Sequence, residues 1–136
     1  MSRRRGIRPG RRPLLLALGL AWACGAAPAA AIRPQTGAVQ EGKATYYSDN
    51  LAGHPTASGE PYDPQALTAA HRTLPFGTRV RVTRLSNERS IEVTINDRGP
   101  FGRSDQIIDL SRAAADALDM LDAGMTRVRL EVIEVP

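Results

Sequence analysis

The stretch SIEVTINDRGPF, residues 90–101, decides how this chain is expected to fold. Over its first seven positions, apolar isoleucine and valine alternate with polar residues, which is the two-residue period of a strand with one buried face. The chain then turns at Arg98-Gly99-Pro100. Extending the strand's period places Asp97 on the inward face, at the strand's end.

The flanking sequence predicts more short strands. RVRVTRL (79–85) alternates in the same way, and Asn87-Glu88 marks a turn, so the two stretches predict an antiparallel hairpin. Three other strands are predicted, over GKATYYS (42–48), at Ile107-Ile108 and over 126–135.

One helix is predicted, over Ser111–Met120. Ser111 is a natural N-cap, the following stretch is rich in alanine, and Gly124 provides a stop nearby. Many short strands with one helix indicate a mainly β fold, a small β-barrel. Residues 49–65 are punctuated by glycine and proline, which predicts a long structured loop of the kind that often carries function.

The charge of the chain is unevenly distributed. Its 136 residues carry a formal net charge of +4, from 18 basic and 14 acidic groups. Six of the basic groups are arginines among residues 1–31, which contain no acidic residue, so residues 32–136 hold 12 basic and 14 acidic groups, a net of −2. The basic balance therefore belongs to the N-terminal segment and does not indicate a nucleic-acid partner.

Residues 1–31 are typical of an export signal peptide. An arginine-rich start precedes an apolar run, Leu14–Ala23, which is too short to span a bilayer. The sequence is compatible with cleavage after Ala31 and with lipidation of Cys24, the only cysteine. It is likewise compatible with export by the general secretory route and by the twin-arginine route. We expect a flexible lead-in over 32–41 and a single domain over 42–136.

Three side chains are candidates for chemistry. Asp97 is a catalytic carboxylate at the mouth of the barrel or an aspartate that caps the following turn. His71, in Ala-Ala-His, either hydrogen-bonds a catalytic carboxylate or a substrate hydroxyl, or is a buried structural residue. Glu60 is by default an exposed loop residue. The histidines lack a metal-ligand spacing, so neither a metal nor another cofactor is expected.

The aromatic residues of the predicted domain suggest a surface for stacking on sugar rings. Adjacent strand residues face opposite ways, so one of Tyr46 and Tyr47 is expected to point away from the core. Phe76 and Phe101 are expected in the core or as loop anchors.

These motifs together resemble the rare lipoprotein A family of bacterial lytic transglycosylases. The resemblance runs from about Gly42 to Val135. It rests on GKATYYS (42–48), TASGEPYD (56–63), LTAAHRTLPFGTRVRV (67–82), INDRGPF (95–101) and IIDLSRAAADAL (107–118).

The resemblance implies a six-stranded double-psi β-barrel and cleavage of peptidoglycan glycan strands. It implies that Asp97 is the catalytic acid and then base, and that Glu60 and His71 line the same groove. We further expect glycan contacts from Tyr47, Thr56, Ser58, Tyr62 and Arg98.

The implied reaction cleaves the β-1,4 bond between N-acetylmuramic acid and N-acetylglucosamine and leaves a 1,6-anhydro sugar. The alternative is a non-catalytic, peptidoglycan-binding or expansin-like wall-loosening module. Either would act in the periplasm or cell envelope as a monomer on glycan strands, with membrane contact only through a lipid at Cys24.

Overall fold

The computed structural model describes residues 31–136. Cys24 and the predicted leader up to Ala30 lie outside the described residues. The elements follow in the order β1 (Val39–Tyr46), a 3-10 helix η1 (Asp49–Leu51), β2 (Thr68–His71), β3 (Arg79–Arg84), β4 (Ser90–Asp97), β5 (Gln106–Leu110), α1 (Arg112–Ala117) and β6 (Thr126–Glu134).

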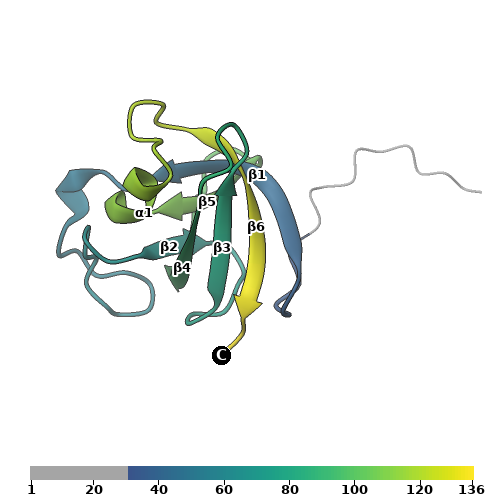
Figure 1. Cartoon of the computed structure of the whole chain (residues 1–136). Coiled ribbons are helices and arrows are strands. Elements are labelled where there is room, and N and C mark those ends of the chain that lie inside the picture. Colours follow the sequence, from purple (N-terminus) through teal and green to yellow (C-terminus); the bar gives the residue numbers. More distant parts are fainter. Residues whose placement is uncertain (1–30) are drawn as a thin grey trace, which may run out of the picture.

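The six strands form one closed barrel in the spatial order β1-β5-β2-β4-β3-β6 (Figure 1). Strand β1 closes the barrel by pairing with β6 antiparallel and with β5 parallel. Strand β2 pairs parallel with β4 and antiparallel with β5. The antiparallel β3–β4 hairpin is present, and the predicted mainly β barrel of six strands with one short helix is confirmed.

The barrel interior is filled by the inward residues that strand alternation predicts. Val80 and Val82 of β3 and Ile95 of β4 are fully buried, and Val93 is nearly so. Burial of such side chains contributes roughly 1.5–3 kcal/mol each. The apolar period of these strands therefore fixes which of their faces is inside.

Helix α1 packs against β1, β4 and β5 through fully buried Ala114 and Ala115. Ser111 caps it, because its hydroxyl accepts a hydrogen bond from the Ala114 N–H. The helix ends at Ala117, three residues before the predicted end, and Asp119 then takes a left-handed backbone conformation. Within residues 31–136, no helix is long and apolar enough to cross a membrane.

The first two strands differ from prediction. Strand β1 begins at Val39, inside the predicted lead-in, and Ile32 at the start of that segment is buried in the core. The Gly37 N–H also donates to the Val132 carbonyl at 2.8 Å, so β6 orders this segment. Strand β2 was not predicted, because its sequence Thr-Ala-Ala-His shows no apolar alternation; pairing with two neighbours forms it.

One of the two adjacent tyrosines points away from the core, as predicted. Tyr46 packs against the core and donates to the Leu121 carbonyl, whereas Tyr47 lies in a separate buried cluster with Tyr62 and Ala70. The expectation that Phe101 lies in the core or anchors a loop is wrong, since 77% of it is exposed. The turn that follows Asp97 directs the Phe101 side chain outward.

Candidate active site

A β-bulge turns Asp97 away from the barrel interior. Ile95 pairs with Ala69 of β2, and the next pair along these strands joins Asp97 to Ala70, so Asn96 is an extra residue in β4. An extra residue in one strand shifts the alternation beyond it. The prediction that Asp97 shares the inward face of Ile95 is therefore wrong: it faces the same side as Ala70, outside the barrel.

Four residues on neighbouring strands form one row across this outer face, which we call the outer row. Thr45 of β1 pairs with Asp109 of β5, Asp109 with Ala70 of β2, and Ala70 with Asp97 of β4. Paired residues on adjacent strands point to the same face of a sheet. Two carboxylates thus flank a small alanine on the surface of the barrel.

Three donors hold the Asp97 carboxylate. The Tyr47 hydroxyl donates to Oδ2, and the N–H groups of Ala57 and Arg98 each donate to Oδ1 at 2.8 Å. The Arg98 bond is the turn-capping contact considered from the sequence. The other two come from distant parts of the chain, so both oxygens of Asp97 accept hydrogen bonds.

The loop after η1 folds back onto the end of β4. The Ser58 N–H donates to the Asn96 carbonyl at 3.2 Å, next to the bond from Ala57 to Asp97. Thr56 is buried, and its hydroxyl donates to the Glu60 carbonyl at 2.7 Å. Gly59 has φ +92°, a conformation that favours glycine, so this tight turn depends on it.

Two tyrosines, whose rings are tilted against each other, pack on the alanine of the outer row. The rings of Tyr47 and Tyr62 lie 4.5 Å apart and form a small cluster with Ala70. Burial, and then the hydrogen bond to Asp97, raise the pKa of Tyr47, so its hydroxyl stays protonated and donates. A cavity of about 90 Å³ opens beside them, and its lining is Tyr47, Leu51, His54, Pro55, Thr56, Tyr62 and Asp97.

Asp109 has a different environment from Asp97. Its Oδ1 accepts one hydrogen bond, from the Thr45 hydroxyl at 3.1 Å. Burial raises the pKa of Asp109 to about 6; the Thr45 hydrogen bond opposes this increase, and the nearby Asp97 charge adds a smaller one. Asp109 is thus held partly as the neutral acid near pH 6.

His71 lies on the opposite face of the same strands. It pairs with inward Ile108 and is only 2% exposed. Its Nδ1 accepts from the N–H groups of Thr73 and Leu74, both at 3.1 Å, and its Nε2 lies 3.0 Å from Gln40 Oε1. Burial first, and then the charges of two arginines, lower the pKa of His71 to about 4.

Arg98 is directed toward the protein. Its Nη1 donates to the carbonyls of Leu74 at 2.7 Å and His71 at 3.2 Å, and its guanidinium lies 4.1 Å from the centre of the Phe76 ring. The arginine therefore joins the turn after β2 to the turn after β4, and it supports the backbone beside Asp97.

The structure brings some of the predicted site residues together and separates others. Those that gather at the cavity are Asp97, Tyr47, Thr56 and Tyr62. Ser58 contributes its backbone to the same loop, and Glu60 is exposed at the loop's end. His71 and Arg98 make their hydrogen bonds inside the protein.

Sequence reasoning missed Asp109 and Thr45. Asp109 stands between apolar Ile108 and Leu110 in a predicted strand, which is a signal that it faces outward. Nothing in the sequence pairs it with Asp97, because that neighbourhood depends on β2, which was not predicted.

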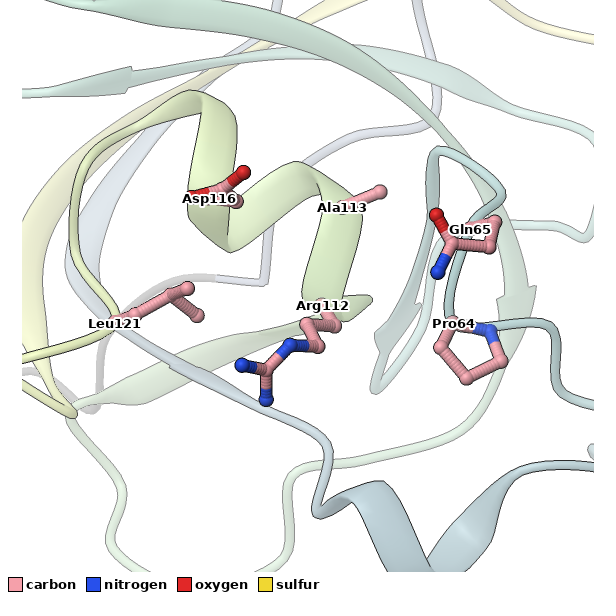
Figure 2. Close-up of a pocket in the computed structure, with 6 residues that line it drawn as sticks. All are labelled: Pro64, Gln65, Arg112, Ala113, Asp116 and Leu121. Carbon is pink, nitrogen blue, oxygen red and sulfur yellow. The ribbon is translucent and has the colours of Figure 1, made fainter.

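A second hollow lies beside α1, lined by Pro64, Gln65, Arg112, Ala113, Asp116 and Leu121 (Figure 2). The Arg112 guanidinium there is paired with Asp49, at 2.8 Å and 2.9 Å to its two oxygens. Across residues 31–136, no cluster of three His, Cys, Asp or Glu side chains could hold a metal ion. The outer row is therefore the stronger candidate for chemistry.

Comparison with known families supports this choice. A family model described as lytic transglycolase matches residues 39–130. The chain belongs to this lytic transglycolase family. The match spans the first five strands and reaches the middle of β6, so the predicted double-psi form of the barrel and the resemblance to rare lipoprotein A proteins are confirmed.

This family member is similar to curated proteins that are much longer. It is 56% identical over 95 residues to the probable endolytic peptidoglycan transglycosylase RlpA of Nostoc sp., covering 68% of this chain and 25% of that protein. It is 48% identical over 97 residues to the endolytic peptidoglycan transglycosylase RlpA of Campylobacter jejuni, covering 71% and 35%. The chain thus spans between a quarter and two fifths of the length of such relatives.

A solved structure shows the same barrel in another setting. The Streptomyces papain inhibitor superposes with a TM-score of 0.60 and 29% identity, over 75% of this chain and all of that one. That protein is named for the inhibition of papain. The barrel alone therefore does not fix the activity of a lytic transglycolase family member, and the side chains of its site must carry the argument.

Proposed function

We propose that this protein is a lytic transglycosylase that cleaves peptidoglycan glycan strands between N-acetylmuramic acid and N-acetylglucosamine. The observation that carries the proposal is the Asp97 carboxylate, held by three donors at the edge of a cavity. The relatives named as endolytic peptidoglycan transglycosylases supply the substrate class.

The reaction needs a base for an internal displacement. As the glycosidic bond between C1 and the leaving oxygen breaks, the leaving oxygen takes up a proton, and the C6 hydroxyl oxygen of the muramoyl unit bonds to C1 and releases its own proton. Asp97, as a carboxylate, accepts that proton. The product carries a 1,6-anhydro end, and no water is consumed. General-base help of this kind contributes about 10²–10⁴ in rate.

The surrounding residues hold Asp97 ready for this step. Tyr47 and Ala57 reach its two oxygens from separate elements, and Arg98 fixes the turn beside it. Tyr47 and Tyr62 line the cavity to which we assign a sugar ring. Glu60 is exposed at the end of the loop, and we assign it a contact with sugar hydroxyls further along the glycan.

We place this activity in the cell envelope, where the substrate occurs. Export by the N-terminal segment, and an anchor at Cys24 if it is lipidated, would bring a monomer to the glycan. The net charge of −2 over residues 32–136 does not favour electrostatic capture of anionic wall polymers. Recognition is therefore assigned to shape and hydrogen bonds at the cavity.

The test is to incubate the purified chain with sacculi stripped of stem peptides and to analyse soluble products by mass spectrometry. The proposal predicts glycan fragments with anhydromuramoyl ends. A parallel co-sedimentation assay measures binding to the same sacculi. Binding without new products would replace the proposal with a wall-binding or expansin-like module, and neither binding nor products would remove glycan as the substrate.

A further inference from the structure

The leaving oxygen of the glycosidic bond needs a proton that Asp97 is poorly placed to supply. Both Asp97 oxygens already accept hydrogen bonds, from Tyr47, Ala57 and Arg98. A carboxyl group whose two oxygens both accept hydrogen bonds is organised as an anion, which accepts a proton rather than donates one. If one residue acted first as acid, one of these donors would have to be displaced.

Asp109 is the second carboxyl group of the outer row. Its Cα and that of Asp97 are each one strand away from Ala70, so the two lie about 10 Å apart across the sheet. Ala70 has a small side chain, and it leaves the two carboxyl groups facing the same side. Asp109 is partly exposed on this outer face of the barrel.

The hydrogen bonds of Asp109 differ in kind from those of Asp97. Thr45 donates to its Oδ1, and no hydrogen bond from within residues 31–136 engages Oδ2. An oxygen without a donor is the position at which a carboxylic acid carries its proton. The Thr45 bond fixes the orientation of the group and leaves that second oxygen free for substrate.

We propose that Asp109 is a second catalytic residue, the general acid that protonates the leaving glycosidic oxygen while Asp97 acts as the base. This inference rests on the proposed transglycosylase function. It replaces the single acid-then-base role of Asp97 with a division between two carboxyl groups whose surroundings favour opposite protonation states.

The proton balance closes over one turnover. Asp109 gives its proton to the N-acetylglucosamine O4 as the C1–O4 bond breaks. Asp97 takes the proton of the C6 hydroxyl as the O6–C1 bond forms. The enzyme is left with Asp109 ionised and Asp97 protonated, and exchange with solvent restores both groups without any other reactant.

The environment of Asp109 agrees with this role. Burial raises its pKa to about 6, and the Asp97 charge adds to the increase. The groups that face Asp109 are Thr45 of β1, Tyr47 directly after β1, Tyr62 of the loop and Asp97 of β4. Since the two tyrosines stay protonated, Asp97 is the charged group among them. The acid form is lost as the pH rises through about 6, so the rate on natural strands is expected to fall there.

The experiment compares leaving groups. The Asp109→Asn variant and the wild type are assayed on denuded glycan strands and on a synthetic muramoyl glycoside with a 4-nitrophenolate leaving group, which departs without protonation. Loss of a general acid predicts a rate decrease of about 10²–10⁴ on strands and less than about tenfold on the nitrophenyl glycoside. Asp97→Asn is expected to lose both reactions. Asp116→Asn, an exposed change on α1, is the matched control and should alter neither.

A second variant keeps the carboxyl group and covers the case in which Asp109→Asn fails to fold. Thr45→Val removes the hydrogen bond that lowers the pKa of Asp109. The alkaline decline of the rate on strands should therefore move to higher pH, a shift that a purely structural role would not produce.

The outcomes separate the two proposals. Equal losses on both substrates for Asp109→Asn, or an unmoved pH profile for Thr45→Val, would overturn the role of Asp109 while leaving the proposed function intact. A wild type without any anhydro product would instead remove the proposed function itself.

Discussion

The two faces of strands β2, β4 and β5 show opposite uses of polar residues. On the inner face, Ala69, Ile95 and Ile108 belong to the apolar core, and His71, an ionisable group among them, has its ring nitrogens engaged by the protein. On the outer face lie two carboxyl groups, those of Asp97 and Asp109, and that of Asp97 lines a cavity. The inward and outward residues are adjacent in β2 and β5, and in β4 they are separated only by the extra residue Asn96.

This difference teaches that a side chain's role follows from the face it occupies. His71 and Asp97 are both polar residues at strand ends. The first completes a buried turn, and the second reaches the cavity because one extra residue in β4 reverses its direction. The family resemblance implied that His71 lines the same groove as Asp97, but the two side chains lie on opposite faces of these strands.

The largest expected effect comes from Asp97→Asn. Asparagine keeps the size of the side chain and an oxygen for the Ala57 and Arg98 N–H groups, so the fold should persist. It removes the base, and the initial rate of anhydro-end formation should fall by about 10²–10⁴. The rate is measured by mass spectrometry, with circular dichroism as the control for folding. Full activity in a folded variant would show that the outer row does not carry the chemistry.

The inner face is tested by His71→Ala. The change leaves the N–H groups of Thr73 and of buried Leu74 without their acceptor. The free energy of unfolding is expected to fall by about 2–4 kcal/mol, measured by urea denaturation. His54→Ala, at an exposed histidine of the loop, is the matched control and should change it by less than about 0.5 kcal/mol. Equal effects at both positions would contradict the buried structural role.

The same histidine predicts a sensitivity to acid. Its folded-state pKa of about 4 is below the ordinary value of 6.5, so the folded protein binds fewer protons than the unfolded chain between these values. The resulting stability is fully present above about pH 6.5 and is lost as the pH falls toward 4, by roughly 3 kcal/mol. Urea unfolding at about pH 7 and about pH 5 measures it. His71→Ala should show a smaller pH dependence, and an unchanged one would assign the effect elsewhere.

Much of the inner face could be predicted from the sequence, because burial imposes a period that residues such as Val80 and Ile95 display directly. The closed barrel of six strands followed from the number of short strands and the resemblance of the motifs. The outer row could not be predicted. It depends on a bulge at Asn96 and on β2, and both are fixed by pairing between distant segments rather than by any local pattern.

The candidate site was predicted unevenly for the same reason. Asp97, Tyr47, Thr56 and Tyr62 do gather, since the loop that carries two of them docks on the end of β4. Arg98 was expected to grip glycan, but its guanidinium donates to the carbonyls of the adjacent turn. A long, flexible side chain finds its partners only once the turns are in place.

The smallest expected effect is that of Tyr47→Phe. The ring keeps its contact with Tyr62, and only the hydroxyl that donates to Asp97 is lost. A hydrogen bond to a charged group contributes about 1.5–3 kcal/mol, so the rate is expected to fall by about ten- to a hundredfold. Tyr62→Phe, whose hydroxyl accepts from the Arg112 N–H instead, is the comparison and should lose less. A larger loss in Tyr62→Phe would show that the hydroxyl of Tyr62, and not that of Tyr47, is the one that supports the reaction.

The central claim is that the outer row cleaves glycan by internal displacement, and the fate of water tests it most directly. Denuded glycan strands are digested by the purified chain in water enriched in ¹⁸O, and the new chain ends are analysed by mass spectrometry. The account predicts 1,6-anhydromuramoyl ends that contain no ¹⁸O, because the C6 hydroxyl of the same sugar supplies the attacking oxygen. New reducing ends labelled with ¹⁸O would show hydrolysis and would contradict it.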